Sequence, residues 1–110
     1  MAERLAAHVW VGAYLTRLGL ANLPAYVLRH GDDTAGAVLV KCATLDGQAT
    51  LWRREWNFES DTRPWTRISA GPEAEIDAAI NREAGFDPDL WVIEIESRDG
   101  RTLLDEDGLG

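Results

Sequence analysis

The sequence has little cysteine, little histidine and no long apolar run. Its single cysteine, Cys42, excludes a disulfide within the chain, which is typical of proteins from a reducing compartment. No apolar stretch approaches the roughly 20 residues that a membrane-spanning helix needs, and the first residues lack the pattern of a secretory signal peptide. We therefore expect a cytoplasmic protein that does not associate with a membrane.

Motifs for catalysis, metal binding and phosphate binding are also lacking. The two histidines, His8 and His30, lie 22 positions apart, and with one cysteine they do not make a zinc site. No acidic cluster has the spacing of a calcium loop, and neither a nucleophilic-serine motif nor a phosphate-binding loop is present. Cys42 lies in an apolar segment, which favours a buried thiol over a nucleophile. We expect no cofactor, no metal and no catalytic residue, and an enzyme is disfavoured.

Negative charge predominates, but it is unevenly distributed. The formal net charge is -8, which disfavours nucleic acid and anionic membranes as partners, because these need a positive surface. Residues 1–67 carry eight basic and seven acidic side chains, whereas residues 68–110 carry three and twelve. The acidic part is either a solvated face or a surface complementary to the rest, within one chain or across a dimer.

The 110 residues are expected to form a single domain over 1–110. Apolar residues recur at helical spacing over 3–20, and Gly71-Pro72-Glu73 begins a second helix that ends before Gly85. Strands are predicted over 25–30, 36–43, 48–58, 63–69 and 90–97, with a short returning strand over 101–104. Residues 105–110 form an acidic tail that we expect to fray.

The predicted element order is α-β-β-β-β-α-β. Tight-turn signals such as Asp46-Gly47 link neighbouring strands, so we predict an α+β fold with a mainly antiparallel sheet of about five strands. We expect the two helices to pack on one face of this sheet. The segment 36–43 is apolar on both faces, which predicts a central strand.

Five blocks of the sequence resemble a small bacterial family, the domain-of-unknown-function family numbered fourteen ninety-one. The blocks are RLAAHVWV at 4–11, TAGAVLVK at 34–41, GPEAE at 71–75, GFDPDLWVIE at 85–94 and LLDE at 103–106. The resemblance covers nearly the whole chain and implies a short bacterial protein that stands alone. It implies no activity, cofactor or functional residue.

Three of the five tryptophans lie between positions 52 and 65, interleaved with arginines. In a strand, alternate residues share a face, so Trp52, Arg54 and Trp56 are predicted on one side of the third strand. On the following strand, either Arg63, Trp65 and Arg67 or Pro64, Thr66 and Ile68 face the same side. The candidate binding residues are Trp52, Arg54, Trp56, Trp65 and Arg67. They are core, a structural ladder of cation–π contacts, or a contact surface, since Trp and Arg are common at interface hot spots.

The leading hypothesis is a non-enzymatic protein-interaction module whose Trp/Arg face binds acidic groups of a protein partner. That partner is either a second copy, in a homodimer, or another protein. The alternative is a small-molecule-binding protein or an undetected enzyme that uses polar groups near the central strands. Those groups are Tyr26, Arg29, His30 and Lys41.

Overall fold

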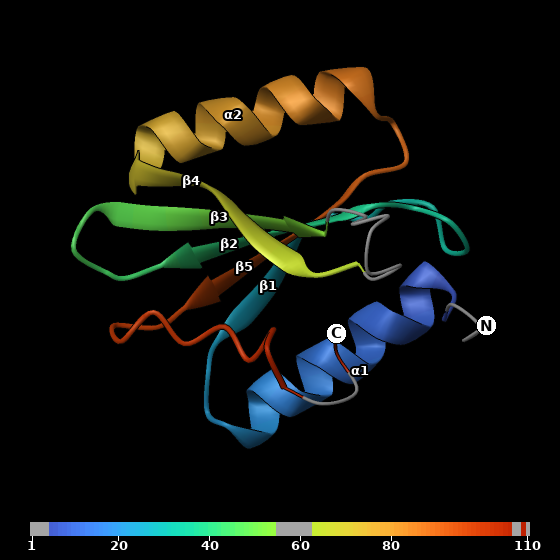
Figure 1. Cartoon of the computed structure of the whole chain (residues 1–110), viewed down its shortest axis with the longest axis horizontal. Coiled ribbons are helices and arrows are strands. Elements are labelled where there is room, and N and C mark those ends of the chain that lie inside the picture. The colour runs from blue at the N-terminus through green and yellow to red at the C-terminus, as the bar shows by residue number, and fades with distance from the viewer. Residues whose placement is uncertain (1–4, 55–62, 107–108, 110) are drawn as a thin grey trace.

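The fold is taken from a computed structural model, which describes residues 5–54, 63–106 and 109. The elements follow the predicted α-β-β-β-β-α-β order (Figure 1). They are α1 (Ala7–Leu20), β1 (Ala25–Arg29), β2 (Val38–Ala43), β3 (Gln48–Arg54), β4 (Trp65–Pro72), α2 (Glu73–Phe86) and β5 (Trp91–Glu96). Among the described residues, neither helix is long and apolar enough to span a bilayer.

The five strands form one sheet in the order β1-β5-β2-β3-β4. The pair β2–β5 is parallel and the other three pairs are antiparallel, which confirms the predicted α+β class and the central position of β2. Residues 101–104 form no strand, so the predicted returning strand is wrong. The predicted continuation of the third strand over 55–58 lies outside the described residues.

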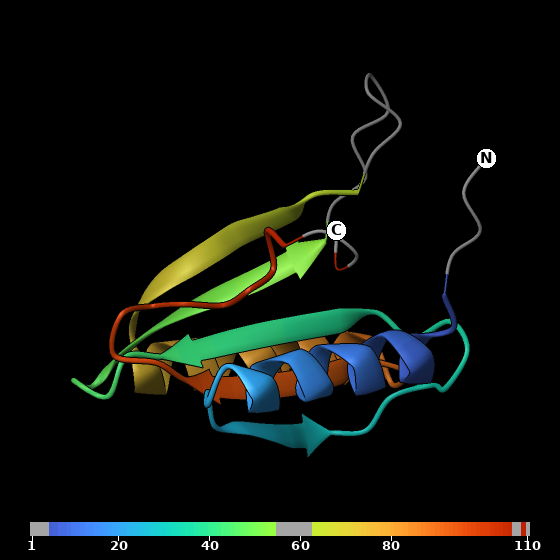
Figure 2. The same cartoon turned by 90° about the horizontal axis from the view of Figure 1, so that it is seen from below.

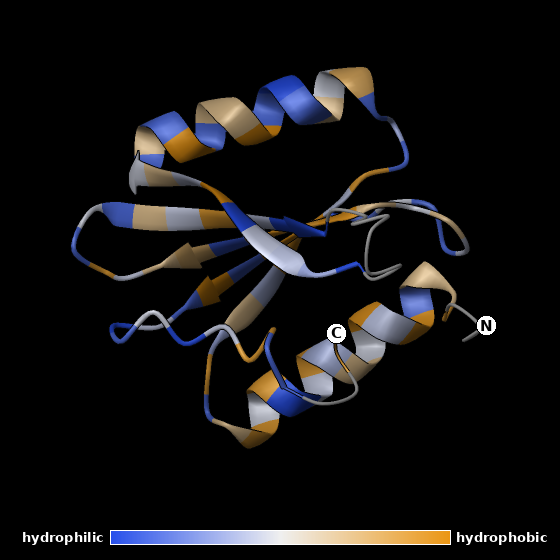
Figure 3. Cartoon of the chain, in the orientation of Figure 1, coloured by the Kyte–Doolittle hydropathy of each residue, from blue (hydrophilic) through white to orange (hydrophobic). Residues whose placement is uncertain are grey.

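The helices cover opposite faces of the sheet, so the expectation that both pack on one face is wrong (Figure 2). On one face, α1 packs with Val40 and Cys42 of β2 and with neighbours on β5. On the other face, α2 packs with Leu39 of β2 and Val92 of β5. The reason is that β2 and β5 are apolar on both faces, so each face needs a cover (Figure 3).

The chain turns back after β5 and packs its last described residues on the α1 face. Leu103, Leu104 and Leu109 are buried in the same cluster as residues of α1, and the Tyr14 hydroxyl donates a hydrogen bond to the Thr102 carbonyl at 2.8 Å. Within the tail over 105–110, the Leu109 side chain is fully buried. The apolar character of Leu109 makes it an anchor despite its acidic neighbours.

Lys41 is the only lysine in the chain, and it lies buried between the sheet and α2. Its Nζ is 2.9 Å from Glu73, 2.8 Å from Asp77 and 2.7 Å from Glu94. Burial acts to lower the pKa of the ammonium, but the hydrogen bonds to Asp77, Glu94 and Glu73 outweigh burial and hold it well above the usual value. Lys41 therefore stays charged at neutral pH and ties α2 to two central strands.

We expect Lys41→Met to destabilise the fold by about 2–4 kcal/mol, because three carboxylates lose the cation between them. The free energy of unfolding from urea titration measures this loss. Arg82→Met is the matched control, since it removes a positive charge from an exposed position of α2 and should cost less than about 0.5 kcal/mol. Equal stability of the two variants would contradict a structural role for Lys41.

Candidate functional site

The candidate residues on β3 and β4 face each other across the two strands. Arg54 lies opposite Trp65, and Trp52 lies opposite Arg67, so the four side chains share one face. This is the face that carries α1, because Trp52 and Trp65 pack against the same cluster as α1. The remaining candidate, Trp56, lies outside the described residues.

Arg54 and Trp65 are brought together with a third residue, Trp10 of α1. The Arg54 guanidinium carbon lies 5.3 Å from the Trp10 ring centroid and 5.2 Å from that of Trp65, and the two rings are 5.2 Å apart. These distances fit cation–π contacts. The sequence placed Trp10 on an apolar helix stripe, but no local pattern showed that this stripe would reach β3 and β4.

The three side chains converge on one backbone oxygen, the carbonyl of Leu109. The Arg54 guanidinium donates to it at 2.7 Å, and the indole N–H groups of Trp10 and Trp65 each donate at 3.2 Å. The sequence held no signal for this contact, because Trp10 and Leu109 are 99 positions apart. We call Trp10, Arg54 and Trp65 the donor trio.

Trp52 and Arg67 do not belong to the donor trio. The Trp52 indole donates to the Thr50 hydroxyl at 2.9 Å, two residues away on β3, and its ring is half-buried. The Arg67 side chain is exposed. The predicted Trp/Arg face is therefore divided: Trp52 and the donor trio contribute to packing, and Arg67 meets solvent.

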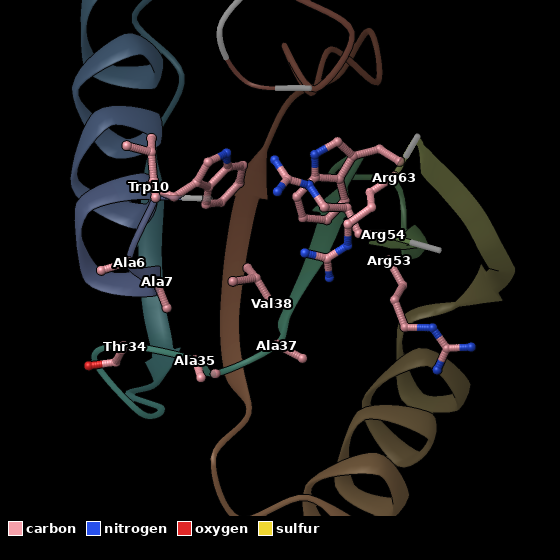
Figure 4. A pocket seen from close by; sticks show the side chains of 13 residues that line it. Ala6, Ala7, Trp10, Thr34, Ala35, Ala37, Val38, Arg53, Arg54 and Arg63 are labelled. Atoms are coloured by element: carbon pink, nitrogen blue, oxygen red, sulfur yellow. The ribbon is translucent and has the colours of Figure 1, made fainter. Parts of the chain in front are cut away.

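A pocket of about 410 Å³ opens beside the donor trio (Figure 4). Its walls are residues 5–7 and Trp10 at the start of α1, residues 34–38 where the chain enters β2, and the adjoining ends of β3 and β4. Among the described residues that line it, every charged one is an arginine. Arg54 and Arg63 lie together across from Trp10, whereas Arg53 points toward α2, where it is 3.8 Å from Glu83.

A second cavity, of about 730 Å³, lies between Trp52 and Trp65 on one side and residues 100–106 on the other. Its lining mixes charges, since it includes Arg101, Asp105 and Glu106. It therefore has no uniform preference for an anion or a cation. The first pocket, which we call the Arg/Trp pocket, is the more selective of the two.

The polar groups of the alternative hypothesis are each engaged in a separate contact. The Tyr26 hydroxyl donates to Glu96 at 2.8 Å, and Arg29 donates to the Pro88 carbonyl at 3.2 Å. His30 contacts Asp33 and the Trp91 ring, and Lys41 contacts its three carboxylates. None of Tyr26, Arg29, His30 and Lys41 lines either cavity.

Cys42 is fully buried in the α1 cluster. Burial raises the pKa of its thiol, and a weaker interaction with Thr50 acts in the opposite direction. A thiol in this setting is protonated at neutral pH and is a poor nucleophile or metal ligand. Within the described part of the chain, no group of three or more His, Cys, Asp and Glu side chains gathers as a metal site would require.

A protein-family model matches residues 5–105, and its description is "Protein of unknown function (DUF1491)". The chain belongs to the DUF1491 family. This confirms the resemblance found in the sequence. A comparison of this DUF1491 protein with functionally curated proteins gives no match.

Solved structures of the family have the same fold. The crystal structure of a DUF1491 protein from Caulobacter crescentus CB15 is 40% identical, with a TM-score of 0.82 over 93% of this chain and 94% of that one. An NMR structure from the same organism is 39% identical, with a TM-score of 0.82 and 96% of each chain covered. The solution structure of protein Atu0922 from A. tumefaciens is 33% identical, with a TM-score of 0.72 over 86% and 87% of the chains.

We expect Arg54→Gln to lower the free energy of unfolding by about 1–2 kcal/mol, because it removes two cation–π contacts and a charge-assisted hydrogen bond. Urea titration measures this change. Arg67→Gln, which removes an exposed arginine from the adjoining strand, is the control and should change stability by less than about 0.5 kcal/mol. A larger loss for Arg67→Gln than for Arg54→Gln would show that the donor trio is not the stabilising contact.

We expect the Cys42 thiol to react with a thiol reagent only as fast as the protein opens, and rapidly in urea, because it is buried and protonated. Absorbance of the released chromophore at about pH 8 follows the reaction. The double variant Cys42→Ala with Ala70→Cys places a thiol at an exposed position of β4 and should react at once. Rapid labelling of native Cys42 would contradict its interpretation as core.

Proposed function

We propose that this DUF1491 protein is a non-enzymatic interaction module that binds an acidic segment of a protein partner at the Arg/Trp pocket. The observation that carries the proposal is the pocket itself, in which all the charged lining residues that the structure describes are arginines. Two of its walls, Trp10 and Trp65, are aromatic. An acidic side chain would gain charge-assisted hydrogen bonds there, with apolar contact to the rings.

The exposed Arg67 extends this positive surface along β4. Arginine suits such a surface because its planar guanidinium donates several hydrogen bonds in a fixed geometry that matches a carboxylate. The charge distribution of the chain supports a homotypic variant of the proposal. Residues 68–110 carry three basic and twelve acidic side chains, so a second copy offers acidic groups to the pocket.

We also propose that the protein works in the cytoplasm, which its single free thiol supports. One observation favours the alternative of a small-molecule ligand: the Arg/Trp pocket, at about 410 Å³, falls within the size range of ligand sites. Such a ligand would occupy the Arg/Trp pocket rather than the surroundings of Tyr26, Arg29, His30 and Lys41. It would carry a negative charge for the same reason as an acidic segment.

We expect a capped hexaglutamate peptide to bind at least about tenfold more tightly than the isosteric hexaglutamine peptide, and salt to weaken the binding. Isothermal titration calorimetry measures both dissociation constants. Arg63→Glu, at the pocket, should weaken hexaglutamate binding by about tenfold or more, whereas Arg98→Glu, at the exposed turn after β5, makes the same charge change and should not.

Equal affinity for the two peptides, or equal effects of the two substitutions, would contradict an acid-binding pocket. Light scattering across a salt series then identifies the homotypic case. A dimer that dissociates at high salt makes a second copy the partner, whereas a monomer that binds hexaglutamate directs the search to another acidic protein.

A further inference from the structure

The donor trio directs more hydrogen bonds at one backbone oxygen than a carbonyl oxygen accepts with good geometry. Three donors, from Trp10, Arg54 and Trp65, converge on the single carbonyl oxygen of Leu109. A carbonyl oxygen has two lone pairs, whereas an ionised carboxyl group has about four acceptor sites on two oxygens. The arrangement therefore suits a carboxylate better than the neutral carbonyl that it holds.

We propose that the donor trio is a receptor for a carboxylate, and that the Leu109 carbonyl is an intramolecular occupant that such a ligand displaces. The inference rests on the proposed function and deepens it, because it names the atoms that would read the acidic group. The donor trio comes from three separate elements: Trp10 lies on α1, Arg54 on β3 and Trp65 on β4. All three residues also line the Arg/Trp pocket, from which a ligand would enter once Leu109 is displaced.

The donor trio combines two kinds of donor. One guanidinium supplies one positive charge, and the two indole N–H groups supply neutral donors. The flat shape of a carboxylate matches the planar guanidinium between the two rings. Apolar pocket residues such as Val38 and Ala7 would contact the body of the ligand. The expected ligand class is a carboxylate on an apolar or aromatic body.

Among the described residues, the backbone hydrogen bonds around Leu109 are local. The Leu109 N–H donates to the Glu106 carbonyl at 3.2 Å, and the Glu106 N–H donates to Leu103 at 3.1 Å. Leu103 has a φ of 61°, which is unfavourable for a residue with a side chain. A carbonyl released from the donor trio would be hydrated. The exchange would also take the Leu109 side chain out of the α1 cluster, and the apolar body of the ligand would have to replace that packing.

The indole N–H signals of the ¹⁵N-labelled protein test the proposal. Benzoate is the probe, and benzamide, which has nearly the same shape but no charge, is its control. We expect benzoate to shift the Trp10 and Trp65 signals in a saturable way, at least tenfold more strongly than benzamide. The Trp91 and Trp52 signals serve as references, because their N–H groups donate to the Asp32 carbonyl and the Thr50 hydroxyl.

Variants assign the effect to the donor trio. Trp65→Phe keeps the ring and removes one donor, so it should weaken benzoate binding about three- to tenfold. Arg54→Gln should abolish the response, and Arg67→Gln should leave it unchanged. Equal shifts with benzoate and benzamide, or equal losses from Arg54→Gln and Arg67→Gln, would overturn the proposal. If Arg54→Gln does not fold, the probe pair and Trp65→Phe still decide.

Hexaglutamate, added to the same labelled protein, separates this inference from the proposed function. Shifts of Trp10 and Trp65 with both benzoate and hexaglutamate support the receptor for free and peptide-borne carboxylates alike, and shifts with benzoate alone support it for a small acid. Calorimetric binding of hexaglutamate that leaves both signals unmoved would overturn the inference while the proposed function stands. No binding of either probe would overturn both.

Discussion

The burial of β2 and β5 on both faces is the constraint on which the rest of the structure depends. Their apolar residues alternate between the two clusters, so neither face of the central strands can be left to solvent. One helix must cover each face, and α1 covers the face on which Trp52 of β3 and Trp65 of β4 lie. This placement brings Trp10 to Arg54 and Trp65, so the candidate site is a consequence of how the core is closed.

Lys41, the one buried charged residue in the part of the chain that the structure describes, follows from the same constraint. Position 41 lies on the α2 face of a central strand, where an apolar residue would ordinarily stand. The ammonium is tolerated because carboxylates from α2 and β5 surround it. The two faces thus differ in kind: on one, a cation is enclosed by acids, and on the other, a cation is enclosed by aromatic rings.

Local sequence patterns predicted the helices and strands. Long-range contacts determine the packing of the helices and the residues of the candidate site, which these patterns did not predict. Alternation and turn signals gave the order of elements and the central strand, because these depend on neighbouring residues. The apolar segment at 36–43 implies that both faces of its strand are covered, whereas the prediction packs both helices on one face of the sheet. The hairpin left open which residues of the fourth strand share a face with Arg54, and the register of β3 and β4 places Trp65 there. Trp10 and Leu109 reach the site only through tertiary packing. No pattern within a short window can show such a contact.

The long separation between Trp10 and Leu109 also has a consequence for biosynthesis. Because 99 positions divide them, a ribosome adding 5–20 residues per second needs roughly 5–20 s between the two codons. During that interval the nascent helix carries an exposed tryptophan, and β2 lacks the neighbour that β5 will provide. The sheet can therefore close only after β5 has been synthesised, and the donor trio only after Leu109 has been added. Chaperones would meet an incomplete apolar surface until then.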